Sequence, residues 1–263
     1  MSKIKYYKSI DKAISIVCGH GVSKKFPVHR HLSLSVGMVV SGSRILTINQ
    51  SKYVVAEGDI FIINSEEPHS ISETNDAGHD YIVLSISLEY LKKFYTQDRL
   101  YFFNIVENAV IAENLSLLFN SLINDKEIEN VNFYIEEIIR SLQFCIDARN
   151  VINHEDDRLK RIRYILDNQI DVPISLEELA DKAFLSMFHF SRLFKKLTGL
   201  APHQYLLDNR LRAARNLLER KMSIADIAIM TGFYDSSHFV RHFTKYYGVS
   251  PLDFQKGTNI LHL

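Results

Sequence analysis

The feature that most constrains this chain is a segment that occurs twice. "HFSRLFKK" spans 189–196 and "HFVRHFTK" spans 238–245, and the similarity extends over 175–205 and 223–254 with one residue added in the second copy. The matched pairs are Ser175 and Ser223, Leu179 and Ile227, Ala180 and Ala228, Phe190 and Phe239, Arg192 and Arg241, Phe194 and Phe243, Gly199 and Gly248, and Pro202 and Pro251. An internal duplication explains this agreement far better than chance. The region is therefore expected to fold into two copies of one unit.

Each copy has the pattern of a helix, a short turn and a second helix. Ser175 followed by Glu178 is a capping box, which starts a helix. Gly199 and Gly248 are typical of helix C-termini, and each is followed by a proline three residues later. The pattern predicts two helix-turn-helix units.

The second helix of each copy separates an apolar face from a polar one. Phe190, Leu193, Phe194 and Leu197 form the expected buried stripe of the first copy, and Phe239, Phe243 and Tyr246 form that of the second. The outward faces carry Phe188, Ser191, Arg192 and Lys195 in the first copy and Ser237, Val240, Arg241 and Thr244 in the second. Because an arginine can bond O6 and N7 of guanine together, this division suits a DNA recognition helix. A plain amphipathic helix with a solvated arginine explains one copy, but explains two copies in register poorly.

Residues 205–221 between the copies read as one helix, with Leu207, Leu211, Ala214 and Leu218 on a common face. A rigid helix there would fix the separation of the two units, which must be near one turn of DNA, about 34 Å. The arginines of this stretch, Arg210, Arg212 and Arg215, either contact phosphates or lie on the solvated surface.

The first ~90 residues read as short strands separated by turns, which predicts an all-β barrel or jelly roll. Two helical patterns follow, at 112–125 and 130–150, and their apolar stripes either cap the barrel or form a dimer interface. Residues after 158 read as helices with no strand. The expected domains are a β domain over 1–96, a helical and candidate dimerisation segment over 97–149, a linker over 150–157 and a helical DNA-binding domain over 158–257.

The composition further restricts the class of protein and the source of any DNA affinity. Hydrophobic residues make up 46% of the chain and charged residues 24%, which is typical of a globular protein. The segment 1–150 has 15 Lys and Arg against 18 Asp and Glu, and 151–263 has 16 against 13. Any DNA affinity must therefore come from local placement of charge. Two unpaired cysteines, Cys18 and Cys145, and the absence of a signal sequence or an apolar span predict a cytoplasmic protein without membrane association.

Residues 158–257 resemble the DNA-binding domain of the AraC/XylS family of bacterial transcription regulators, most closely in "IADIAIMTGFYDSSHFVRHFTKYYGVSPLDF". The resemblance implies two helix-turn-helix units that enter adjacent major grooves of double-stranded DNA. By position it makes Phe188, Ser191 and Arg192 base-contacting, with Lys195 beside them, and in the second unit Ser236, Ser237, His238 and Arg241. Ser236 and Ser237 are short side chains, so the second unit is expected to read bases more weakly and to rely more on phosphates.

The front of the chain, "PVHRHLSLSVGMVVSG" and "YVVAEGDIFIINSEEPHSI", resembles the cupin-type effector domain that many members of this family carry. The candidate effector-binding residues are His29, His31, Arg44 and His69. The three histidines are weak candidates for a metal site, because no carboxylate follows the first pair as in metal-binding cupins, although Glu66 or Glu67 would be able to complete a set. We expect no cofactor.

The sequence is compatible with three functions. The first is a regulator that binds a small molecule, forms a homodimer on DNA and contacts RNA polymerase if it is an activator. The second is a metal-dependent cupin enzyme that uses the histidines. The third is a ligand-independent DNA-binding regulator controlled by its abundance or by a protein partner.

Overall fold

The computed structural model describes residues 3–74, 78–97, 100–124, 130–148, 157–172 and 174–261. The chain forms two compact units, one built mainly from the first 151 residues together with 257–263, the other mainly from 152–256. The expected linker begins outside the described residues, over 150–156, and its last residue, Asp157, is already the first of a helix.

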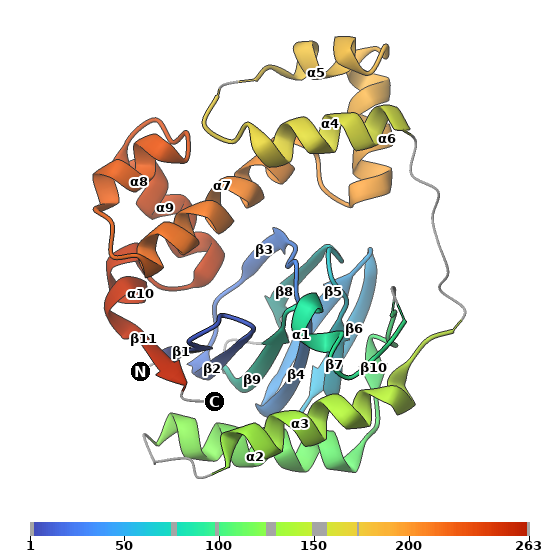
Figure 1. Cartoon of the computed structure of the whole chain (residues 1–263), viewed down its shortest axis with the longest axis vertical. Coiled ribbons are helices and arrows are strands. Elements are labelled where there is room, and N and C mark those ends of the chain that lie inside the picture. Colours follow the sequence, from blue (N-terminus) through green and yellow to red (C-terminus); the bar gives the residue numbers. More distant parts are fainter. Residues whose placement is uncertain are drawn as a thin grey trace. The chain divides into compact units, whose positions relative to one another are not determined.

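The N-terminal unit is a pair of sheets (Figure 1). The seven-stranded sheet has the order β10-β7-β4-β9-β2-β1-β11 and the four-stranded sheet the order β3-β8-β5-β6. The strands are β1 (Lys3–Ser9), β2 (Ile14–Val22), β3 (Phe26–His29), β4 (Leu34–Ser41), β5 (Ser43–Ile48), β6 (Ser51–Ala56), β7 (Ile60–Ile63), β8 (His69–Glu73), β9 (His79–Ile86), β10 (Ile105–Val106) and β11 (Thr258–Leu261). The expected jelly-roll-like β domain is confirmed, but its strands form two sheets and not one closed barrel.

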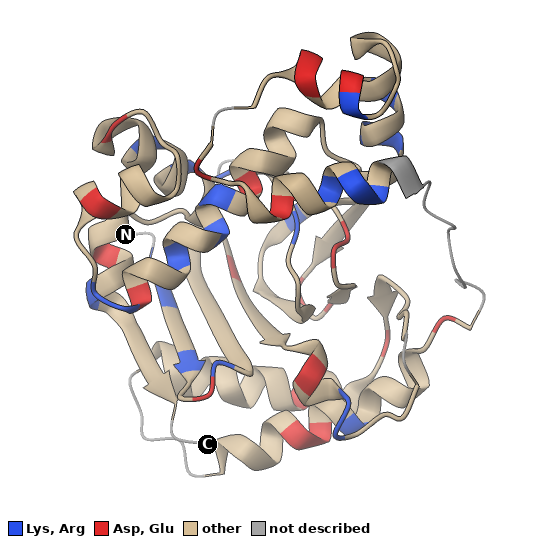
Figure 2. Ribbon diagram, turned by 45° about the horizontal axis from the view of Figure 1, so that its top comes forward, with Lys and Arg blue, Asp and Glu red and all other residues tan. Residues whose placement is uncertain are grey.

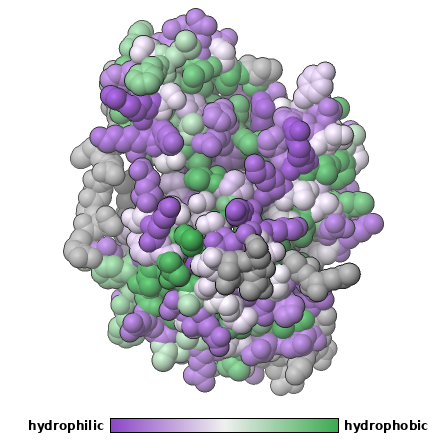
Figure 3. All heavy atoms as spheres, turned by 180° about the vertical axis from the view of Figure 1, so that it is seen from behind, coloured by the Kyte–Doolittle hydropathy of each residue, from purple (hydrophilic) through white to green (hydrophobic). Residues whose placement is uncertain are grey.

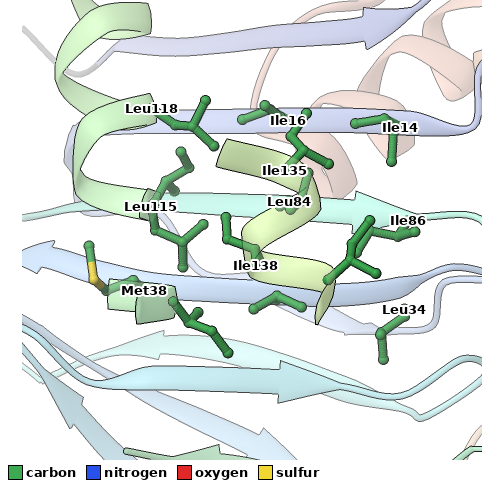
Figure 4. Close-up of a cluster of buried hydrophobic side chains, with 14 of the residues drawn as sticks. Ile14, Ile16, Leu34, Met38, Leu84, Ile86, Leu115, Leu118, Ile135 and Ile138 are labelled. Carbon is green, nitrogen blue, oxygen red and sulfur yellow. The ribbon is translucent and has the colours of Figure 1, made fainter. Parts of the chain in front are cut away.

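Helices cover one face of the larger sheet. A short helix α1 (Leu88–Leu91) precedes β10, and α2 (Ala109–Ile123) and α3 (Val131–Ser141) follow it, with a 3-10 turn η1 (Leu142–Cys145). The apolar stripes of α2 and α3 pack on alternate residues of β2, β4 and β9 (Figure 4). The side chains at this interface include Ile14, Ile16, Leu34, Met38, Leu84, Ile86, Leu115, Leu118, Ile135 and Ile138. These stripes therefore cap their own sheet, which decides between the two uses left open by the sequence.

Polar groups on β1 hold the end of α2. The buried Nζ of Lys5 donates hydrogen bonds to the carbonyls of Leu122 (3.1 Å) and Ile123 (2.9 Å), and the hydroxyl of Tyr7 donates to Leu122 (2.8 Å). The last carbonyls of a helix have no partner within it, and a cation there also complements the helix dipole. Strand β1, which the sequence patterns did not predict, thus attaches helix α2 to the sheet.

The C-terminus returns to the N-terminal unit. Strand β11 pairs in parallel with β1 in the register Tyr6 with Thr258 to Ser9 with Leu261, and Leu261 joins the buried core of the sheet. The expectation that everything after residue 158 is helical is therefore wrong for the last four described residues. Four residues are too short to show a strand period, and their pairing depends on the edge offered by β1.

The second unit consists of seven helices within the described residues. They are α4 (Asp157–Asn168), α5 (Leu176–Lys182), α6 (Met187–Thr198), α7 (Pro202–Glu219), α8 (Ile224–Met230), α9 (Ser236–Tyr247) and α10 (Pro251–Gly257). Helices α5 and α6 form the first predicted helix-turn-helix, α8 and α9 form the second, and the 18-residue α7 joins them.

We expect Leu118→Ala to lower the free energy of unfolding by about 2–5 kcal/mol, because it removes a fully buried side chain between α2 and the sheet. Leu88→Ala, at an exposed position of the same unit, is the matched control and should change it by less than about 0.5 kcal/mol. Urea denaturation followed by circular dichroism measures both. Equal effects of the two changes would contradict this packing.

Candidate nucleic-acid interface and effector site

The two helix-turn-helix units have caps at equivalent positions. The Ser175 hydroxyl accepts from the Glu178 amide, and the Glu178 carboxylate accepts from the Ser175 amide, as the capping box predicts. Helices α6 and α9 begin with Ser186 and Asp235, whose side chains accept from the amides three residues later. Both helices end at a glycine in the left-handed conformation, Gly199 (φ 71°) and Gly248 (φ 78°). Residues with identical roles therefore set the length of each recognition helix.

The turns of the two units differ at one equivalent position. Phe184 in the first turn adopts φ 56°, and Gly232 in the second adopts φ 71°. A bulky residue is strained in this region, whereas glycine is not. Gly232 has a second reason to lack a side chain, because a Cβ there would lie 2.7 Å from the carbonyl oxygen of Ile170. The turn of the second helix-turn-helix is thus closely packed at this position, whereas the turn of the first is open.

Helix α6 presents the predicted outer face. Phe190 and Phe194 are fully buried, while Arg192 and Lys195 are exposed and Phe188 is 77% exposed. The Arg192 guanidinium lies 5.8 Å from the centre of the Phe188 ring, so the aromatic ring can hold the cation near the helix surface.

Two residues on α6 differ from the exposure that the sequence predicts. Leu197 was expected in the buried stripe but is 38% exposed, because it lies in the last turn, beyond the phenylalanine core. Ser191 is only half-exposed and lines a pocket of about 230 Å³ with His203 and Arg210, so it lies at the side of the outer face.

Helix α9 repeats the arrangement with a different surface. Ser237 and Arg241 are exposed, and Ser236 is half-exposed at the first turn. The His238 ring packs against His242, with ring centres 4.5 Å apart, and its Nδ1 is buried. Burial and the neighbouring His238 lower the pKa of His242, which favours its neutral form. His238 therefore packs partly within its own unit, and Arg241 is the exposed cation among the residues predicted for this helix.

Helix α7 is fastened to the elements on either side of it. Asn209 donates to the carbonyl of Leu166 and to Asp167 in α4, both at 2.9 Å. Beside Asn209, the buried Asp208 carboxylate accepts from the Tyr246 hydroxyl of α9, and near the end of α7 the carbonyl of Leu218 accepts from Gln255 of α10. At about 1.5 Å per residue, the 18 residues of α7 span about 27 Å, which is of the order of one DNA turn.

The arginines of α7 bind within their own domain. Arg210 Nε donates to the carbonyl of Ile170 (2.6 Å), and Arg212 pairs with Asp208 (3.2 Å). Arg215 pairs with Glu219 (3.7 Å) and lies over aromatic rings of α9 and α10. The structure thus gives each of these arginines a partner within the helical unit. Of the two roles that the sequence left open, phosphate contact and solvated surface, phosphate contact is therefore the less suited.

Charge is not concentrated in one region of the ribbon. Figure 2 shows Lys and Arg interspersed with Asp and Glu on both units, and hydrophilic and hydrophobic side chains mix on the face shown in Figure 3. This agrees with the expectation that DNA affinity comes from a few placed cations and not from a broad basic surface.

The three predicted histidines lie at or next to the ends of β3 and β8. His29 ends β3 and His69 begins β8, which are neighbours in the four-stranded sheet. The rings of His31 and His69 have centres 4.8 Å apart, and one ligand atom from each of the three histidines lies within 4.8 Å of the others. The Nδ1 of His69 is 3.0 Å from the carbonyl of Glu67, a second contact that commonly orients metal-binding imidazoles.

Glu67 does not complete this histidine set. Its buried carboxylate accepts from the side chains of Asn49 (2.7 Å) and Asn104 (2.8 Å), from the hydroxyl of Tyr101, and from the amide of Asn64 (2.9 Å). These bonds join the turn before β8 to the segment before β10. The carboxylate is therefore a structural acceptor, which corrects its candidacy as a metal ligand.

Arg44 lies in the N-terminal unit. It is fully buried at the start of β5, its Nη1 is 3.3 Å from Nε2 of His79, and its guanidinium lies over the rings of Phe61 (4.8 Å) and Tyr81 (4.5 Å). The sequence patterns did not identify these three neighbours, because they come from β7 and β9 and meet Arg44 only through sheet packing.

Among the described residues, no helix is both long enough and apolar enough to cross a membrane. Comparison with known sequences gives a match to the AraC-like ligand binding domain over 17–141 and to a helix-turn-helix domain over 179–257. The chain is 29% identical over 243 residues to the probable transcriptional regulator LumQ of Photobacterium leiognathi, covering 89% of this chain and 92% of LumQ. It is 26% identical over 250 residues to the transcriptional activator RhaS of Citrobacter koseri, covering 90% of each.

Solved structures of ToxT from Vibrio cholerae share the fold. An apo variant has a TM-score of 0.56 at 13% identity and covers 95% of this chain and 99% of ToxT. ToxT bound to an unsaturated fatty acid also has a TM-score of 0.56, at 12% identity, covering 98% and 95%. The two domain matches and the sequence relatives, and not the ToxT likeness, show that the chain belongs to the AraC family of DNA-binding transcription regulators, with a ligand-binding domain before a helix-turn-helix domain.

Proposed function

We propose that α6 and α9 enter successive major grooves on one side of a DNA duplex and read bases there. The observation that carries this proposal is the matched pair of exposed arginines, Arg192 and Arg241, on two helices that have caps at equivalent positions and are connected through α7. Two helices held in this way favour a target with two half-sites about one helical turn apart.

In the first unit, Arg192 is the principal base-reading residue. Its guanidinium can take guanine O6 and N7, while the exposed Phe188 ring contacts a thymine methyl group or a sugar. Lys195, one turn further along the helix, is assigned to a phosphate. Ser191 contributes less than these, because it is half-buried beside a pocket.

In the second unit, Arg241 reads a base and the residues at the start of α9 bind the backbone. Ser236 and Ser237 have short hydroxyl side chains near a helix N-terminus, which suits phosphate binding. His238 offers only the ring edge that the His242 packing leaves open. We therefore assign weaker sequence discrimination to this unit.

The N-terminal unit binds a small effector that controls DNA binding. His29, His31 and His69 form one candidate set of contacts and Arg44 another. If the protein is an activator, it also contacts RNA polymerase. A regulator acts on chromosomal DNA, so we place it in the cytoplasm, and we assign it no catalytic activity.

A metal-dependent enzyme and a ligand-independent regulator remain the alternatives. The histidine cluster is the observation that favours the first, because three imidazoles can hold a divalent cation. Stoichiometric iron or manganese in the purified protein, together with turnover, would establish an enzyme. A thermal-shift panel of sugars, amino acids and organic acids tests the second, because an effector that binds only the native state raises its melting temperature.

We expect Arg192→Ala to cost about 1–3 kcal/mol at one base position of the target and to relax specificity there, because it removes bonds to a base edge. Lys195→Ala should instead weaken specific and random DNA equally and reduce the salt dependence. Titrations on the target and on single-base variants, at several salt concentrations, measure both. Equal losses on specific and random DNA for Arg192→Ala would assign Arg192 to phosphate.

We propose a homodimer that uses the outer faces of α2 and α3. Leu117 on α2 and Phe133 on α3 are 43% and 59% exposed, on helices whose inner faces already pack on the sheet. Leu117→Glu should convert the dimer into a monomer in analytical ultracentrifugation, because a carboxylate would have to be buried at the contact. A dimer of unchanged affinity would exclude this surface, and a monomeric parent protein would exclude the dimer.

A further inference from the structure

The interior of the N-terminal unit contains a cation with an unusual enclosure. The guanidinium of Arg44 is 0% exposed and lies over the rings of both Phe61 and Tyr81, with ring centres 4.8 and 4.5 Å away. A fully buried charged side chain is rare unless it is paired. Burial lowers the pKa of Arg44 only to about 10, so the side chain remains a cation at neutral pH.

The space for this enclosure depends on two glycines. Gly19 lies opposite Tyr81 in the register of β2 and β9, and Gly37 lies opposite Phe61 in the register of β4 and β7. A Cβ at Gly19 would lie 2.2 Å from the Tyr81 ring, and one at Gly37 would lie 2.2 Å from the Phe61 ring. Each ring therefore occupies the space that a side chain at the glycine of the neighbouring strand would fill.

The hydrogen bonds of Arg44 are incomplete, and the unused donors lie on one edge. Nη1 is within 3.3 Å of His79 Nε2, while Nε and Nη2 are buried and have no acceptor among the described residues. Glu73 is the register partner of Arg44 on β8, but no described carboxylate forms an ion pair with the guanidinium. The N–H bonds of Nε and Nη2 point in parallel, and this fork fits the two oxygens of a carboxylate.

The surrounding groups do not neutralise the charge. His79 is held neutral, since burial and the nearby Arg44 lower its pKa to about 4. The two rings attract the cation but supply no negative charge. The two rings themselves belong to apolar clusters, Phe61 with Val39, Leu46 and Ile63, and Tyr81 with Val22 and Phe26.

We propose that the Nε and Nη2 edge of Arg44 is an effector site for a small monocarboxylate with an apolar body. The carboxylate would take both free donors, and its apolar part would lie among the buried side chains between the two sheets. Because Arg44 is enclosed, the strands around it must open and close as the ligand enters. Occupancy of the site is thereby linked to the geometry of the domain. This inference rests on the proposed function, since it names the chemical class of the effector.

The test observes Arg44 directly in the full-length protein. In ¹H–¹⁵N NMR spectra, the Nε–H signal of Arg44 is assigned by its absence in Arg44→Lys. We expect at least one of formate, butanoate and benzoate to shift this signal and raise the Tm by about 5 °C at a hundredfold excess over Kd. The matched neutral probes, formamide, butanamide and benzamide, should do neither. Arg44→Lys keeps the cation but loses the fork, so its Tm should not respond.

Arg44→Met removes the charge and keeps the length of the side chain. We expect this variant to be at least as stable as the parent without ligand and to be insensitive to carboxylates, because an unpaired buried charge is removed. The proposal is overturned if no carboxylate shifts the Arg44 signal, if acids and amides act alike, or if Arg44→Met melts lower while carboxylates leave the parent unchanged. DNA binding is measured separately. Loss of the ligand effect with DNA binding intact refutes only this inference, whereas absence of DNA binding refutes the proposed function.

Discussion

The burial of α7 between two helix-turn-helix units is the constraint on which the rest of the DNA-binding domain depends. Hydrogen bonds from Asn209 fix one part of this helix to α4, and the Tyr246–Asp208 bond fixes it to α9. Both partners of the latter bond are buried, so neither can exchange it for water without cost. A joining helix held in this way transmits one fixed spacing to two recognition helices. In the DNA complex that we propose, α6 and α9 would then bind together as one rigid pair.

Much of this domain could be predicted because its sequence carries local signals. The capping box at Ser175, the left-handed glycines at 199 and 248 and the phenylalanine stripes follow rules that involve only a few neighbouring residues. The error at Leu197 also has a local origin: helical spacing places it on the apolar stripe, but the core ends one turn earlier. Spacing predicts which face a residue occupies, and packing decides whether that face is covered.

The fold class of the N-terminal domain could be predicted from the sequence, but the arrangement of its strands could not. Short strands rich in Val and Ile predict a β domain, but the same strands suit one closed barrel or two sheets. Strand β11 and the surroundings of Arg44 depend on pairings between residues far apart in the chain, as with Gly37 and Phe61. Arg44 was a sequence candidate for the effector site, but its aromatic enclosure and its free donor edge emerge only from the fold.

The central claim is that two matched helices read two adjacent major grooves. Methylation interference on a target found by genome-wide mapping of DNA occupancy tests it most directly, because it reports contacts at guanine N7. We expect two groups of contacted guanines on one face of the duplex, about 10 base pairs apart. Arg192→Ala should remove contacts from one group and Arg241→Ala from the other. One group only, or two groups on opposite faces, would contradict the account.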